Sequence, residues 1–252
     1  MKTRFPLRAA AVLAALTAAL PAWAQTTLAP GGTASGTVTA NTSIYQLFGH
    51  SGTVHASQAA TTASAPYYSF AASDGSSTSF SFESVTGGVN CCGNPAALSG
   101  ADGYSGSTNV LPLNGLSGIF GNTQLGLVAV FTSEADPFGQ TAPASLNWNA
   151  STQAGTQSPL LNQVFFVGDG HAGLNKPAGQ LLSFVAPAGA TRLYIGFADS
   201  YSFSGLPGYY SDNRGELNYT LTLSAPVPEP ASALLALAGV GLLVATRRRQ
   251  GA

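Results

Sequence analysis

Short apolar stretches separated by clusters of Gly, Pro, Asn and Ser make up most of this chain. Between residues 25 and 224 no stretch sustains the apolar spacing of an amphipathic helix. Residues 79–83 (SFSFE) alternate strictly, so Phe80 and Phe82 should share one face of a strand. Residues 217–223 (LNYTLTL) alternate in the same way. This pattern predicts an all-β domain of many short strands joined by turns.

Two other apolar runs are continuous instead of alternating. Residues 125–131 (LGLVAVF) and 164–167 (VFFV) are too short for helices, and we expect them to form buried strands. Only 8 % of the residues are charged and 30 are glycine, which suits an exported β-protein better than a helical enzyme. We therefore expect residues 25–224 to form one antiparallel β-sandwich of the jelly-roll kind.

The first 24 residues have the three zones of a secretory signal peptide. Basic residues precede an apolar stretch at residues 9–20, and the small-residue sequence Ala-Trp-Ala follows. This order predicts cleavage by a signal peptidase before Gln25. A permanent membrane span is the alternative, but the apolar core is shorter than the roughly 20 residues that cross a bilayer. We therefore assign residues 1–24 to a signal peptide.

The end of the chain, residues 225–252, carries a second signal. A proline-containing linker leads to an apolar stretch at residues 231–246, and a basic cluster follows. Such a stretch lodges in a membrane as a helix with its positive end in the cytoplasm, so these residues by themselves indicate a tail anchor. The residues that define the motif and the cluster are Pro228, Glu229, Pro230, Arg247, Arg248 and Arg249.

The order of motif, apolar helix and basic end resembles the PEP-CTERM sorting signal. The resemblance implies an exported envelope protein that the C-terminal helix first anchors in the membrane. An exosortase would then cut near Pro-Glu-Pro and leave the domain at the surface or secreted.

Charge between the two signals narrows the choice of partners. This part of the chain has three basic residues against nine acidic ones, a net charge of −6, although the full chain has a formal net charge of −1. A nucleic-acid-binding domain needs a basic face, so nucleic acid is excluded as a partner. A surplus of carboxylates is compatible with divalent cations.

Cys91 and Cys92 are adjacent, and they are the only cysteines of the chain. In an oxidising compartment they can form a vicinal disulfide or pair between molecules. Two cysteines alone do not make a zinc site. We expect them to have a structural role, with a disulfide between Cys91 and Cys92.

Residues for catalysis are not evident. The histidines are His50, His55 and His171, and the five-residue spacing of the first two does not place them on one strand or helix face. No serine lies in a G-x-S-x-G sequence. Asp169, in Gly-Asp-Gly-His, is typical of a turn. A glycan-processing enzyme is a remote alternative that lacks a defensible pair of catalytic carboxylates. We therefore expect a protein that is not an enzyme.

Hard oxygen ligands gather in residues 198–217. Asp199, Asp212 and Asn213 lie in a glycine-rich segment just before a predicted strand. Calcium takes roughly six to eight oxygen ligands from carboxylates, amides and backbone carbonyls, and glycines let a chain fold around the ion. An ordinary turn into a hairpin strand is the alternative interpretation.

Residues 206–215 (LPGYYSDNRG) resemble the calcium loop of the PA-I galactophilic lectin family, which is approximately VPGTYGNNSG. The resemblance covers residues 164–223 and extends weakly to residues 79–103. It implies a galactose-binding-like sandwich with a calcium ion. When the family's ligands are transferred residue by residue, the resemblance implies that the side chains of Asp199, Asp212 and Asn213 bind calcium. Tyr209 would contribute its backbone carbonyl.

The chain departs from that family in three ways. The connection between Asp199 and Leu206 is longer, and Asp212 stands where the family has asparagine. The family's second sugar-contacting stretch, with a His and a Gln, has no counterpart near Asp102. We expect a calcium-binding module that engages carbohydrate, with exopolysaccharide as the ligand. The alternative is a purely structural surface or biofilm-matrix protein whose loops only stabilise the sandwich.

Overall fold

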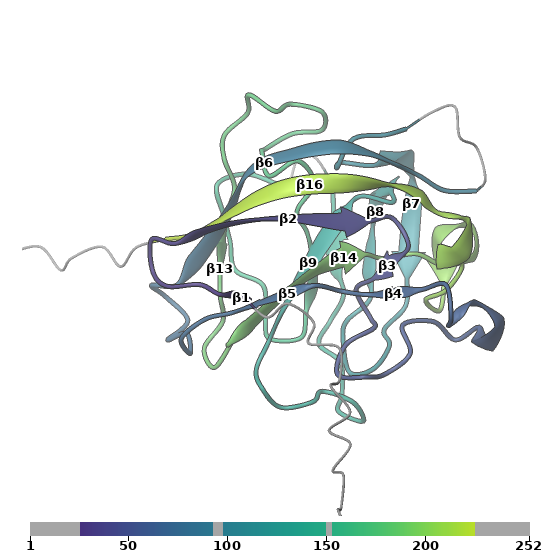
Figure 1. Cartoon of the computed structure of the whole chain (residues 1–252), viewed down its shortest axis with the longest axis horizontal. Helices are drawn as coiled ribbons and strands as arrows, with labels where there is room; N and C mark the ends of the chain where they lie inside the picture. Colours follow the sequence, from purple (N-terminus) through teal and green to yellow (C-terminus); the bar gives the residue numbers. More distant parts are fainter. Residues whose placement is uncertain (1–25, 93–97, 150–152, 225–252) are drawn as a thin grey trace, which may run out of the picture.

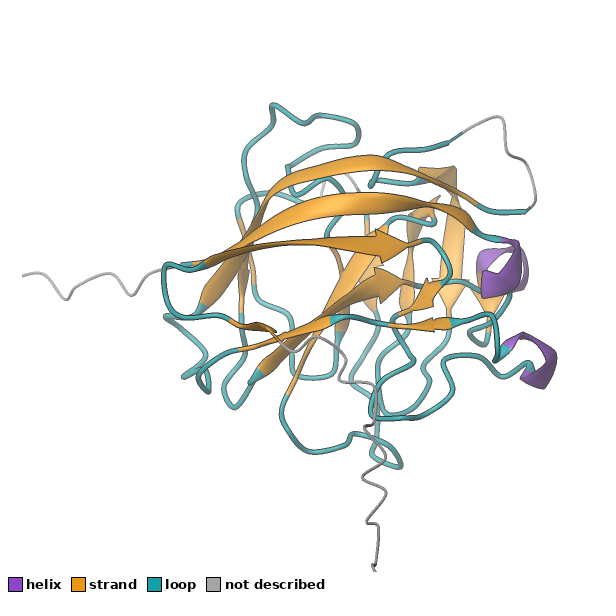
Figure 2. Cartoon of the chain, in the orientation of Figure 1, coloured by secondary structure: helices purple, strands orange, loops and turns teal. Residues whose placement is uncertain are grey.

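The structure is a computed structural model, and it describes residues 26–92, 98–149 and 153–224. Strands and loops form this part of the chain, and Figure 2 shows helix only as short turns. These turns are the 3-10 helices η1 (Ala56–Gln58), η2 (Tyr201–Phe203) and η3 (Tyr210–Asp212). In the described residues no helix has the length and apolarity needed to cross a bilayer. The expected signal peptide and sorting tail lie outside the described residues.

A five-stranded sheet has the order β11-β13-β6-β16-β2. Its longest members, β6 and β16, pair antiparallel, and Figure 1 shows them beside β2 along the upper part of the molecule. The alternating residues behave as predicted: Phe80 and Phe82 of β6 are fully buried, as are Leu217 and Leu221 of β16. The strands are β2 (Thr33–Thr39), β6 (Ser79–Asn90), β11 (Thr156–Gln157), β13 (Ser183–Val185) and β16 (Arg214–Leu223).

A seven-stranded sheet lies at the centre. Strands β9 and β14 pair antiparallel over six residues each, and β12 adds to the other side of β9. Every residue of β9 and β12 is buried, which confirms that the two continuous apolar runs are buried strands. The strands are β1 (Thr26–Thr27), β3 (Thr42–Ser43), β4 (Ala63–Ser64), β5 (Tyr67–Ser69), β9 (Leu127–Thr132), β12 (Val164–Phe166) and β14 (Arg192–Phe197).

A smaller four-stranded sheet has the order β10-β8-β7-β15. Its centre is the antiparallel pair of β7 and β8, which Figure 1 shows behind the other sheets. The short strands β10 and β15 pair in parallel at its two edges. The strands are β7 (Tyr104–Val110), β8 (Ile119–Gln124), β10 (Leu146–Trp148) and β15 (Ser204–Gly205).

Two hydrophobic clusters cover the two faces of the central sheet. Successive residues of a strand point to opposite faces, so Phe131 of β9 joins the cluster that contains Leu221 of the five-stranded sheet. Its neighbour Val130 joins the other cluster, together with Ile119 and Trp148 of the four-stranded sheet. The central sheet is therefore buried on both faces, which explains why β9 has no polar alternation.

The structure confirms the all-β class and corrects the expected antiparallel arrangement, because all three sheets are mixed. Long strands pair antiparallel, whereas short ones such as β3 pair in parallel with β4 and β14. Parallel neighbours need a long connection, and the loops of this chain are long enough to bring short segments alongside a strand in either direction. The jelly-roll, galactose-binding-like topology is not confirmed.

Candidate functional site

The predicted calcium loop connects the central sheet to the five-stranded sheet. β14 ends at Phe197, and β16 begins at Arg214. The Tyr210 ring lies fully buried inside the loop, and its hydroxyl donates to the carbonyl of Phe197 at 3.3 Å. The same hydroxyl oxygen accepts the N–H of Asp199 at 3.2 Å. Tyr210 therefore fixes the point at which the chain leaves the central sheet.

The carboxylate of Asp199 lies at the centre of a hydrogen-bond network. Asp199 is only 2 % exposed. Oδ2 accepts a hydrogen bond from Nδ2 of Asn213 at 2.7 Å, and Oδ1 accepts the backbone N–H of Ser200 at 2.7 Å. Asn213 Nδ2 also donates to the carbonyl of Ala40 at 3.2 Å. The two ends of the loop are thus joined through one buried carboxylate.

Burial is the main influence on the ionisation of this group, and it raises the pKa of Asp199 to about 7. The hydrogen bonds from Asn213 and Ser200 oppose the rise, and the negative charge of Asp212 adds to it. Burial also raises the pKa of Tyr104 to about 12, with smaller contributions from the charges of Asp199 and Asp212. Asp199, Asp212 and Tyr104 therefore share a region of negative potential that a cation would relieve.

Two oxygens close to this carboxylate are buried without a hydrogen-bond partner: Asn213 Oδ1 and Ser200 Oγ. Leaving a buried polar atom unpaired costs about 1–3 kcal/mol, so each such atom calls for an explanation. Amide and hydroxyl oxygens next to a carboxylate are ligands that calcium accepts. The donor types around Asp199 therefore fit a hard cation.

A metal site built from charged and ring ligands alone is not present in the described residues. In residues 26–92, 98–149 and 153–224, no group of three or more His, Cys, Asp or Glu side chains is placed to hold a metal ion. A cation beside Asp199 would therefore depend on the amide, hydroxyl and backbone oxygens of the loop as well as on carboxylates.

The four predicted ligands differ from one another in their position and contacts in the structure. Asp199 and Asn213 are in direct contact. Asp212 is half-buried at the end of η3 and influences Asp199 through its charge. Tyr209 has a left-handed backbone with φ of 69°, and its ring packs against His55 and Tyr201 at centroid distances of 4.6 and 5.1 Å. The metal role of all four residues stays a prediction.

Sequence reasoning missed Ser200 and a second buried acid, Asp102. Oδ1 of Asp102 accepts the N–H of Asp169 at 2.9 Å, and Oδ2 accepts the N–H of Asn175. Burial raises the pKa of Asp102, and these two hydrogen bonds oppose the rise. Asp169 itself accepts the N–H of His171 at 2.9 Å, which is the turn geometry expected for it. These contacts fix a loop and bring no acid into the Asp199 network.

Cys91 and Cys92 are bonded to each other in a vicinal disulfide. Sγ of Cys91 contacts the hydroxyl of Tyr104, the tyrosine whose pKa is raised mainly by burial and further by the charges of Asp199 and Asp212. The disulfide and Tyr104 line an open cavity of about 530 Å3 together with Gln124. The disulfide is therefore close to the acidic region of the predicted calcium loop.

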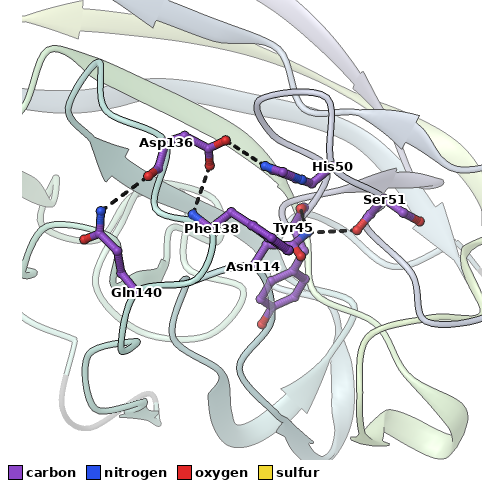
Figure 3. A network of polar contacts seen from close by, with 7 residues as sticks. All are labelled: Tyr45, His50, Ser51, Asn114, Asp136, Phe138 and Gln140. Atoms are coloured by element: carbon purple, nitrogen blue, oxygen red, sulfur yellow. Dashed lines mark hydrogen bonds and ion pairs between the residues drawn. The ribbon is translucent and has the colours of Figure 1, made fainter.

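A separate polar network joins three loops (Figure 3). Nε2 of His50 lies 2.7 Å from Oδ2 of Asp136, and Oδ1 of Asp136 accepts the N–H of Phe138 at 2.9 Å. The His50 ring stacks on Phe138 with centroids 4.3 Å apart. Asn114 donates to two backbone carbonyls in residues 45–51, at 3.0 and 2.9 Å. These contacts hold loops together, and we assign no chemistry to them.

Comparison with known protein families identifies a sorting motif near the C-terminus. A family model described as the PEP-CTERM protein-sorting motif matches residues 226–250. This match includes the Pro-Glu-Pro sequence and the arginine cluster, so the sorting motif predicted from the sequence is confirmed. The motif implies an exported protein that an exosortase processes and that is sorted to the cell surface.

No curated protein and no solved structure matches the chain. The resemblance to the PA-I galactophilic lectin family therefore receives no support from these comparisons.

Proposed function

We propose that the exported domain is a non-enzymatic, calcium-binding module that holds carbohydrate, with exopolysaccharide as its ligand at the cell surface. One observation carries the proposal: the buried carboxylate of Asp199 is accompanied by the unpartnered oxygens of Asn213 and Ser200. The sorting motif supports the location, because a protein delivered to the surface is exposed to the polysaccharide there.

Charge supports calcium as the ion. An ionised carboxylate is costly to bury unless an opposite charge or several hydrogen bonds compensate it. Asp199 has two hydrogen bonds in the described residues and the repulsive charge of Asp212 close by. Asp199, Ser200 and Asn213 would hold the ion from the loop, with Asp212 adding charge. Bound calcium would supply an electrophilic centre for the hydroxyl oxygens of a sugar.

The second candidate is a structural surface or biofilm-matrix protein without a specific ligand. The hydrogen bond between Asn213 and Asp199 supports it, because that contact closes the loop without an ion. A pKa of Asp199 near 7 also supports it, because a substantial fraction of the carboxyl would be neutral at neutral pH and would then need no counter-charge.

A glycan array distinguishes the two candidates. The exported protein should bind one or more glycans in calcium and lose that binding in chelator. Asp199→Ala should abolish the calcium-dependent binding, whereas Glu83→Gln, which removes an exposed acid from β6, should leave it intact. Binding that is absent under both conditions would favour the structural candidate.

A further inference from the structure

Arg192 lines a cavity of about 320 Å3. Arg192 and Tyr194 are two residues apart on β14, so they lie on the same face of the central sheet. Tyr67 of β5 is directly opposite Tyr194, and the two rings are 4.8 Å apart. Phe48 comes from the loop after β3 and lines the cavity as well. We call this cavity, with Arg192, Phe48, Tyr67 and Tyr194, the Arg192 pocket.

Aromatic rings hold the guanidinium in the Arg192 pocket. Cζ of Arg192 lies 5.3 Å from the ring centroid of Phe48 and 5.4 Å from that of Tyr67. These distances are within the range of cation–π attraction. Across the described part of the chain, no carboxylate forms an ion pair with Arg192. In the described residues the positive charge of Arg192 therefore has no direct acidic partner, as is also true of Lys176 and Arg214.

Phe48 reaches the guanidinium from a strained position. Its φ is 53°, in the left-handed region that non-glycine residues adopt only rarely. Such strain persists where the surroundings enforce it, and it is concentrated at ligand-binding positions. The ring contact with Arg192 therefore comes with a local conformational cost.

We propose that the Arg192 pocket binds the carboxylate of a uronic acid residue in an acidic polysaccharide. The planar guanidinium matches a carboxylate with two parallel hydrogen bonds. The half-buried rings of Phe48 and Tyr67 offer apolar faces for the C–H side of a sugar ring. Tyr194 is buried, and its side chain hydrogen-bonds Arg192. The volume of the pocket lies at the lower end of the roughly 300–1000 Å3 that is usual for small ligands.

The net negative charge of the domain restricts the kinds of anion that the Arg192 pocket can bind. A net charge of −6 between the two signals repels polyanions in general, so an anionic ligand must gain its affinity from contacts around a single charged unit. A uronate presents one carboxylate and a large uncharged ring, so one arginine among aromatic rings suits it. This inference takes carbohydrate as the ligand from the proposed function, but it does not depend on calcium.

Titration calorimetry with trigalacturonate in chelator tests the proposal on the full exported protein. Wild type should bind the trisaccharide, and its methyl ester and acetate should bind at least tenfold more weakly. Arg192→Gln should lose at least tenfold in affinity, whereas Lys176→Gln, which removes an exposed base elsewhere, should keep wild-type affinity. Arg192→Lys keeps the positive charge but lacks the paired hydrogen-bond donors of the guanidinium. We expect it to have an intermediate affinity and a melting temperature close to that of wild type.

Several results would overturn it: no binding by wild type, equal binding of the ester or of acetate, or equal losses in the Arg192 and Lys176 variants. Asp199→Ala should bind trigalacturonate in chelator as wild type does. Glycan binding that needs calcium, without trigalacturonate binding in chelator, would refute this inference and leave the proposed function standing. Trigalacturonate binding in chelator, without any calcium-dependent glycan binding, would support this inference and refute the calcium-dependent proposed function.

Discussion

Asn213 donates a hydrogen bond of 2.7 Å to the carboxylate of Asp199, although the two residues lie at opposite ends of the loop between β14 and β16. Both residues are almost completely buried. The contact links the central sheet to the five-stranded sheet through a group that gains and loses a proton near neutral pH. We therefore expect the stability of the loop to depend on pH.

The pH dependence of stability follows from that proton. In chelator, the free energy of unfolding should fall as the pH rises from about 4 to about 7. Burial raises the pKa of Asp199 from 3.8 to about 7, so the native carboxyl keeps a proton that the unfolded chain has already released. This stabilisation is complete below about pH 4 and is lost as the pH passes the native pKa, with an upper limit of about 4 kcal/mol.

Denaturant unfolding in chelator at about pH 5 and about pH 8 measures this difference. Asp199→Asn removes the titrating group and keeps the size of the side chain, so its stability should change less between the two conditions. If wild type and Asp199→Asn show the same pH dependence, the carboxyl does not titrate as the structure implies.

The cysteines allow a chemical test. Because Cys91 and Cys92 are bonded to each other, the exported protein should contain no free thiol before reduction and should run as a monomer on a non-reducing gel. Alkylation followed by mass spectrometry should add two labels only after a reducing agent. Two alkylated cysteines without reduction, or a disulfide-linked dimer, would exclude the vicinal bond.

The core prediction concerns Phe131, which is fully buried between the central and the five-stranded sheets. Phe131→Ala should lower the free energy of unfolding by about 3–5 kcal/mol, because it removes buried apolar surface and leaves a cavity. Phe138→Ala is the matched control, since that ring is 59 % exposed, and it should cost about 1 kcal/mol or less. Comparable losses in both variants would contradict the assigned core.

The sorting motif predicts a change in processing. Neutral residues in place of Arg247, Arg248 and Arg249 should disturb membrane retention and cleavage, because the positive end sets the orientation of the apolar segment. Mass spectrometry of surface protein from a host with its exosortase should show that the tail is gone. An intact C-terminal arginine cluster on that protein would contradict exosortase processing.

The strands of the core could be predicted because their signals are local. Alternation in residues 79–83 and 217–223 and the continuous runs at 125–131 and 164–167 show which strands are buried on one face or on two. The mixed pairing could not be predicted in the same way. Two-residue strands such as β3 and β15 carry no periodicity, so their partners depend on contacts with distant parts of the chain.

Part of the candidate site could also be predicted from the sequence. Asp199 and Asn213 come together because they flank one loop, as their sequence positions suggest. The adjacent residues Tyr209 and Tyr210 could not be told apart: one is half-exposed and the other fully buried under the loop. Asp102 was missed because its buried role depends on backbone N–H groups far along the chain.

Thermal melting of the exported protein, with calcium and with chelator, tests the calcium site most directly. A ligand that binds only the folded state stabilises it by about 2.7 kcal/mol at a hundredfold excess over its dissociation constant, or roughly 5–10 °C for a domain of this size. Wild type should melt higher in calcium by about this amount. Asp199→Ala should remove most of the difference, Asp212→Ala should remove part of it, and Glu83→Gln should keep it. Equal melting temperatures for wild type in calcium and in chelator would contradict the calcium site and the function proposed from it.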